Sequence, residues 1–152
     1  MKNYYLSIVL SICVTLGTSV ISYSQDGDVY DQGTVWSLTF VRTGANVADD
    51  YLKDLTKTWK ASMEEAVKEG LIKSYKVLLG GAANKEDFNI VLMIENENMA
   101  VFDTNPEREA KWDAIRKKVE ESMKGEFDNT VRNYENIRQL YGTKLMREIY
   151  LK

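Results

Sequence analysis

Histidine is missing from this 152-residue sequence, and cysteine occurs once, at Cys13. Ser-His-Asp triads, cysteine nucleophiles, zinc sites built on thiolate or imidazole, and haem held by an axial histidine all need these side chains. Asp26, Asp28 and Asp31 suggest a calcium loop, but their spacing misses the EF-hand pattern and no glutamate closes it. We therefore expect no metal and no haem, and no cofactor of another kind is indicated.

Clusters of basic residues are also lacking. The chain has 20 Lys and Arg against 23 Asp and Glu, a formal net charge of −3. Binding of nucleic acid requires clustered cations to neutralise phosphates. The sequence therefore predicts no nucleic-acid partner.

The first 24 residues have the features of a secretory signal peptide. Lys2 precedes the uncharged stretch 4–21, and Ser22 and Ser24 are small residues at the positions that define a cleavage site. A membrane anchor is an alternative, although the stretch contains several Ser, Thr and Gly and has no basic flank on its far side. Lipidation at Cys13 is a minor alternative, because Ile12 is large for a lipoprotein cleavage box. We expect a periplasmic or extracellular protein that keeps no stable membrane span after cleavage near Ser24.

Residues 25–33 are polar and acidic and are predicted to form a flexible leader. The rest of the chain, 34–152, has the length of one domain. Its apolar periodicity and its Gly, Asn and Pro positions predict six elements. In order, these are a strand over 34–42, a helix from an Asn46 cap to Gly70, a hairpin of strands 71–79 and 88–95, a helix from Pro106 to Gly142 that breaks or bends at Gly125, and a strand over 145–151.

The resulting order is β-α-β-β-α-β. This order predicts an α+β, ferredoxin-like fold, in which one antiparallel sheet has its helices on one face. Within the first strand, alternation places Trp36, Leu38 and Phe40 on one side, which we assign to the helices.

The opposite face of the sheet is then unusually apolar for a surface in contact with water. It carries Val35, Val41, Leu78, Val91, Met93, Met146 and Tyr150. So much apolar surface favours a second sheet covering it, and hence a homodimer. The alternative is that one or two strands are assigned to the wrong face by a shift of one residue.

The element order over Thr34–Lys152, the helix ending at Gly70, the Gly80-Gly81 hairpin and the Gly142-Thr143-Lys144 entry to the last strand resemble the dimeric α/β-barrel superfamily. The resemblance implies two ferredoxin-like protomers packed sheet against sheet. Members include cofactor-free monooxygenases, haem-degrading enzymes, isomerases, stress-response proteins and exported proteins without an assigned activity. Absence of histidine argues against the haem-degrading group.

Five side chains are candidate ligand-binding residues of a cavity between sheet and helices: Trp36, Trp59, Tyr75, Trp112 and Arg147. Packing of the tryptophans in the core is the simpler interpretation. Arg147 shares a strand face with leucine and isoleucine, so it needs an anionic partner. That partner is either a ligand or a helix carboxylate such as Glu109 or Glu120.

Two functional classes follow. The first is an exported homodimer that binds a small apolar or anionic compound without performing chemistry. The second is a cofactor-independent monooxygenase or isomerase. The absence of histidine favours the first, because proton transfer near neutral pH usually uses a group that titrates there. No catalytic residue is indicated.

Overall fold

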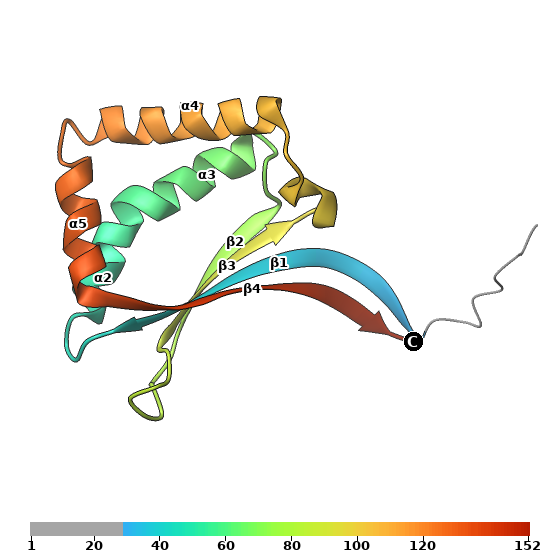
Figure 1. The fold of residues 1–152 in the computed structure, drawn as a ribbon, viewed down its shortest axis with the longest axis horizontal. Coiled ribbons are helices and arrows are strands. Elements are labelled where there is room, and N and C mark those ends of the chain that lie inside the picture. The colour runs from blue at the N-terminus through green and yellow to red at the C-terminus, as the bar shows by residue number, and fades with distance from the viewer. Residues whose placement is uncertain (1–28) are drawn as a thin grey trace, which may run out of the picture.

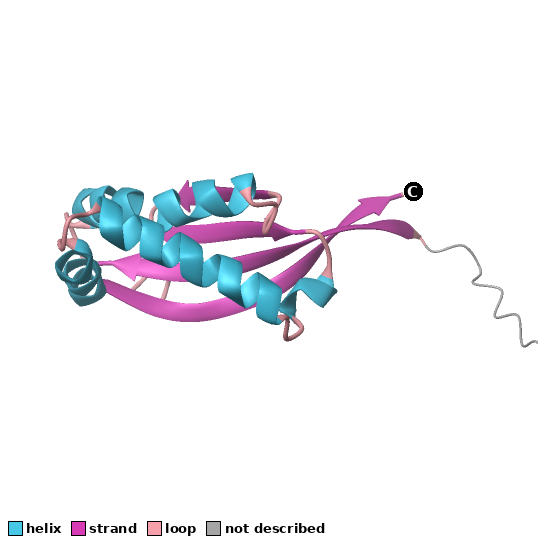
Figure 2. Cartoon of the chain, turned by 90° about the horizontal axis from the view of Figure 1, so that it is seen from above, coloured by secondary structure: helices cyan, strands magenta, loops and turns pink. Residues whose placement is uncertain are grey.

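The computed structural model describes residues 29–152, so the predicted signal peptide and residues 25–28 of the predicted leader lie outside the described residues. A four-stranded antiparallel sheet carries the helices on one face (Figures 1 and 2). Its strand order, β2-β3-β1-β4, with helices after β1 and after β3, is ferredoxin-like and confirms the predicted fold class. The elements are β1 (Tyr30–Thr43), α2 (Ala48–Leu55), η1 (Thr56–Lys60), α3 (Ala61–Lys68), β2 (Ser74–Leu79), β3 (Ile90–Asn96), η2 (Met99–Phe102), α4 (Pro106–Ser122), α5 (Phe127–Ile137) and β4 (Arg138–Leu151).

The first helical segment runs through α2, η1 and α3 without a break in the chain of helical residues. It ends as predicted at Gly70, whose φ of 66° lies in the left-handed region that favours glycine. The predicted cap is wrong: Val47 is the N-cap, and Asn46 turns the chain before it with a φ of 64°. Asparagine tolerates this conformation better than most residues, so its signal marks the turn and not the cap.

The second helical segment begins as predicted. The Asn105 side chain accepts a hydrogen bond from the Arg108 backbone N–H at 3.0 Å, and Pro106 occupies the first turn. Gly125, with a φ of 88°, separates α4 from α5, so the predicted break is confirmed.

Strands β1 and β4 both begin earlier in the sequence than predicted. β1 begins at Tyr30, inside the segment predicted as a leader, and β4 begins at Arg138, inside the segment predicted as helix. The two strands pair from Tyr30 opposite Leu151 to Thr43 opposite Arg138. The added residues of each strand therefore form backbone hydrogen bonds with the partner strand. This long-range pairing outweighs the local sequence pattern.

The face assigned to β1 was wrong by one residue. Val41 packs with Tyr51 and Leu55 of α2, so Val35, Ser37, Thr39 and Val41 face the helices. The alternation expected of a strand was correct, but both sides of β1 contain apolar residues, and only packing against the helices distinguishes them.

We call the other side of the sheet the open face. Its apolar residues are Trp36, Leu38, Phe40, Leu78, Val91, Met93 and Met146. Lys76 lies 4.8 Å above the Trp36 ring, which places both on this face. The predicted open-face positions Leu78, Val91 and Met93 are therefore correct, whereas Val41 is on the helix side.

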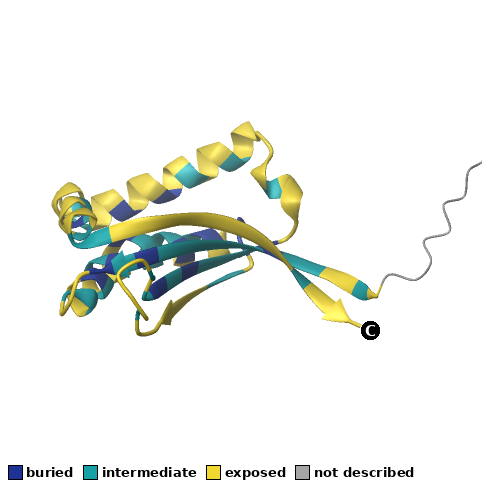
Figure 3. Cartoon of the chain, turned by 60° about the horizontal axis from the view of Figure 1, so that its bottom comes forward, coloured by how far each residue is buried: buried dark blue, intermediate teal, exposed yellow. Residues whose placement is uncertain are grey.

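Helices cover the sheet unevenly (Figure 3). One core cluster joins α2 to β1 and β3 through Val41, Tyr51, Leu55, Ile90 and Leu92. A second cluster joins α3 to α4 and includes Met63, Ala66 and Ile115. Because α4 packs on α3 and stands away from the strands (Figure 1), β4 is exposed along nearly all of its length.

Candidate functional site

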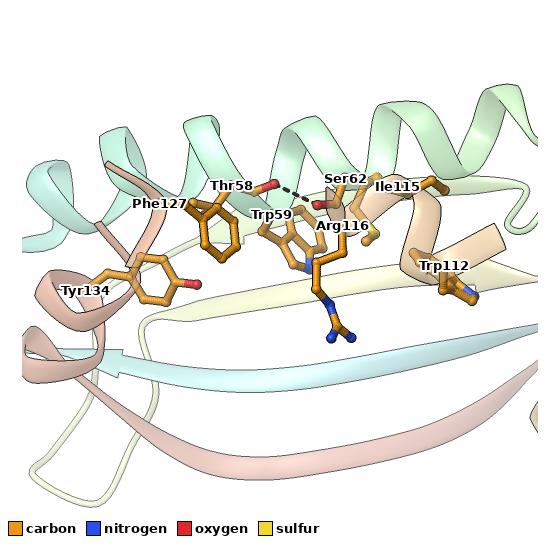
Figure 4. A pocket seen from close by; sticks show the side chains of 9 residues that line it. Thr58, Trp59, Ser62, Trp112, Ile115, Arg116, Phe127 and Tyr134 are labelled. Carbon is orange, nitrogen blue, oxygen red and sulfur yellow. Dashed lines mark hydrogen bonds between the residues drawn. The ribbon is translucent and has the colours of Figure 1, made fainter. Parts of the chain in front are cut away.

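A cavity of about 370 Å³ lies within the helix layer, where η1, α3, α4 and α5 meet. This volume is within the range of small-molecule sites. Its lining combines aromatic rings, small hydroxyls and one cation (Figure 4). The lining residues are Thr58, Trp59, Ser62, Met63, Trp112, Ile115, Arg116, Phe127 and Tyr134.

The η1 segment forms one wall of the cavity. It is a π-helical turn, and it carries Thr58 and Trp59. A π-turn places one more residue in the turn than an α-helix does, which changes the direction of the side chains that follow, and such turns are frequent at functional sites. The Thr58 hydroxyl donates to the Asp54 carbonyl at 3.0 Å, and the Ser62 hydroxyl donates to the Thr58 carbonyl at 3.0 Å. Their oxygen lone pairs stay available to a ligand that donates a hydrogen bond.

Neighbouring rings fix the aromatic walls. Trp59 meets Tyr75 edge to face, with centroids 5.5 Å apart, and Tyr134 meets Tyr51 in the same way at 5.9 Å. The guanidinium of Arg138 lies over the Tyr134 ring, 4.7 Å from its centroid. These contacts hold Trp59 and Tyr134 in place before any ligand binds, and a preorganised site loses less entropy on binding.

Arg116 supplies the cation in the lining. Its guanidinium points away from α4 toward the sheet layer (Figure 4). The Asp113 carboxylate is 3.9 Å from it, and both side chains are more than two thirds exposed. Such a long, exposed pair is weak, so the guanidinium can form hydrogen bonds with an anionic ligand.

The five predicted ligand-binding residues have different locations. Trp59 and Trp112 line the cavity, and Tyr75 contacts the Trp59 ring but is not part of the lining. Trp36 lies on the open face, away from the helices. Arg147 lies on exposed β4, where its guanidinium donates to the Gly33 carbonyl at 3.3 Å in place of the predicted glutamate partners.

Sequence reasoning missed Arg116, Phe127 and Tyr134. The signal for Arg116 was present, because it follows Trp112 by four residues and therefore shares its helix face. Phe127 and Tyr134 share one helix face because they are seven residues apart, but helical spacing does not predict that the bend at Gly125 brings this face to the cavity.

The described residues contain no group of three or more His, Cys, Asp or Glu arranged to hold a metal ion. No helix within residues 29–152 is both long enough and apolar enough to cross a membrane.

Comparison with known proteins gives no evidence on function. No family model matches the chain, and no curated protein matches it. Among solved structures, a dimeric ferredoxin-like protein from an uncultured marine organism is similar, with 13% identity and a TM-score of 0.42 over 80% of this chain and 90% of that chain. Because this TM-score is low, the fold class is assigned from the strand order alone.

Proposed function

We propose that this protein is an exported homodimer that binds a small aromatic or apolar compound carrying an anionic group. The observation that supports the proposal is the cavity in the helix layer, where four aromatic rings surround a space of about 370 Å³ with one guanidinium at its side. Aromatic rings recognise planar apolar groups by contact, and a guanidinium recognises a carboxylate through paired hydrogen bonds. The geometry suits a ligand with both parts.

Tryptophan fluorescence tests the ligand, because Trp59 and Trp112 both line the cavity. A panel of aromatic and fatty carboxylates should change the emission, and EDTA should have no effect. Arg116→Met should weaken binding about tenfold, equivalent to about 1.4 kcal/mol, because methionine keeps part of the apolar stem and removes the charge. Arg147→Met is the matched control, since Arg147 is an exposed arginine outside the lining and should leave binding unchanged.

Loss of binding with Arg147→Met and not with Arg116→Met would contradict the assignment of this cavity. A different result would favour the alternative class: oxygen consumption by metal-free protein with a phenolic substrate would indicate a cofactor-independent monooxygenase.

The homodimer is proposed through the open face. Leu78 is 53% exposed and Met146 46% exposed there, beside the half-buried rings of Trp36 and Phe40. A contiguous apolar surface on a sheet usually marks an interaction site. A second copy of the chain suits this one, because the face also carries both signs of charge, with Lys76 and Glu95 close to Trp36.

Sedimentation of the unaltered protein should show a dimer at micromolar concentration. Met93→Glu, at the centre of the open face, should shift it toward the monomer, because a carboxylate replaces an apolar side chain there and its charge would have to leave water when the two copies pack together. Val67→Glu is the control, since Val67 is 39% exposed on α3 and lies on the helix side. A monomeric unaltered protein would rule out this interface.

Export is proposed from the sequence of residues 1–24. N-terminal sequencing of the secreted or periplasmic protein should begin near Gln25. A protein that retains Cys13 would contradict the proposal.

A further inference from the structure

The β1–β4 pair extends past the rest of the sheet. We call its outer end the arm, which consists of Tyr30–Gln32 and Ile149–Leu151, paired with Tyr30 opposite Leu151. β3 stops short of the arm, because its pairing with β1 begins at Val35. Within residues 29–152 the arm therefore projects as a two-stranded ribbon with no third strand beside it (Figures 1 and 3).

An irregularity at the base of the arm changes its direction. The pairing register shifts between Gln32 and Val35, which places Gly33 and Thr34 opposite the single residue Glu148. A bulge of this kind bends and twists the strand pair. The Tyr150 ring packs on Gly33 so closely that a Cβ there would lie 3.0 Å from its Cε2 atom. Figure 1 shows the arm bending away from the helix layer, toward the side of the open face.

The arm is poorly stabilised by its own contacts. Ile149 is 45% exposed, Tyr150 55% and Leu151 80%. Lys152 and Asp31 form an ion pair at 2.9 Å across the arm, but both side chains are more than half exposed, and such pairs contribute little. An isolated two-stranded ribbon is marginally stable in water, so the arm requires a covering surface to hold its shape.

We propose that the arm packs against the second copy of the chain seated on the open face. This inference rests on the homodimer proposed above and identifies a second part of its interface. Met146, Glu148 and Tyr150 alternate along the open side of β4 and lead from the middle of the open face into the arm without interruption. A partner on that face would meet an arm already bent toward it, and burial of the Tyr150 ring against it would remove apolar surface from water.

Site-specific photo-crosslinking of the full chain tests the contact. Benzoylphenylalanine replaces Tyr150, and protein grown with heavy isotopes is mixed with light protein so that adducts between copies are distinguished from adducts within one copy. We expect adducts between copies at position 150. The same residue at position 67, which is exposed on α3, should give none between copies.

A second measurement uses affinity. The substitution Tyr150→Ser should raise the dimer dissociation constant at least tenfold, whereas Val67→Ser should leave it unchanged. Circular dichroism of the variant checks that the helices and the remaining sheet stay folded.

The possible outcomes separate the two proposals. A monomeric unaltered protein would overturn the homodimer and the arm contact together. A dimer that gives no adduct between copies at position 150, or adducts only to residues of the same chain, would overturn the arm contact and leave the homodimer standing.

Discussion

β3 and β4 flank the same strand, β1, yet their surroundings differ greatly. β3 alternates buried residues such as Ile90 and Leu92 with half-buried ones, whereas β4 is exposed along almost its full length. Composition does not explain this, because β4 also contains many apolar residues, including Leu145 and Ile149. The difference comes from the helices: α2 and α3 lie over β3, and α4 packs on α3 and leaves β4 uncovered. Burial in this fold depends on where the second helical segment rests.

The comparison predicts unequal costs of truncating an apolar side chain. Ile90→Ala should lower the free energy of unfolding by about 2–5 kcal/mol, because Ile90 is fully buried against Val41 and Tyr51. Leu145→Ala on β4 should change it by about 0.5 kcal/mol or less, since Leu145 is 40% exposed. Urea denaturation measures both. Equal losses would show that β4 is covered in the isolated protein.

A second prediction concerns a polar atom within the covered part. Among residues 29–152 no group lies within hydrogen-bond distance and geometry of the buried Tyr51 hydroxyl, and burial raises the pKa of Tyr51, although the Arg138 guanidinium near the hydroxyl oxygen opposes the shift. Tyr51→Phe should raise the free energy of unfolding by about 1 kcal/mol, because it removes the cost of desolvating that hydroxyl. Tyr150→Phe, at an exposed position on β4, should have no measurable effect.

The pH dependence follows from the direction of that pKa shift. The neutral hydroxyl is favoured in the folded state, so the contribution of Tyr51 to stability is complete below about pH 10, the ordinary pKa, and is lost as pH rises toward the raised folded value. Thermal unfolding between pH 9 and 11 should show a decline that is smaller in Tyr51→Phe. An unchanged decline would mean that other groups cause it.

The smallest expected effect concerns the attachment of α4. Glu65 of α3 pairs with Lys118 of α4 and with Lys68, and the hydrogen bonds to these lysines hold the pKa of Glu65 below its ordinary value of 4.5. The stabilisation is therefore present above about pH 4.5 and is lost as pH falls through the lowered folded value. Glu65→Gln should slightly lower the urea midpoint at pH 7 and leave it unaltered at pH 2. Glu121→Gln is the control, because its partner Lys117 lies on the same helix.

Local signals in the sequence predicted the element order and most turns. Gly70 and Gly125 adopt left-handed conformations that glycine allows. At the start of α4, the Asn105 side chain caps the helix and the Pro106 ring fixes the backbone of its first turn. These features depend on a few neighbouring residues, so they can be predicted from one sequence. Trp59 and Trp112 were also found, because helical spacing places both on buried faces.

Features that depend on distant partners could not be predicted in this way. The period of β1 shows alternation, but Val41 and Phe40 are both apolar, and only contact with α2 determines that Val41 faces the helices. β4 begins at Arg138 because that residue pairs with Thr43, almost a hundred positions earlier, although its local pattern is helical.

The sequence by itself determined which side chains are available, with no histidine and a single cysteine, and it determined the order of strands and helices. Tertiary structure decided which face of the sheet is open, where the cavity lies and which cation lines it. The physical reason is that Arg116 and Tyr134 reach the same space only after α4 packs on α3 and the chain turns at Gly125. Side-chain types and local turns depend on short stretches of sequence, whereas a cavity forms only where helices distant in sequence pack together in the folded chain.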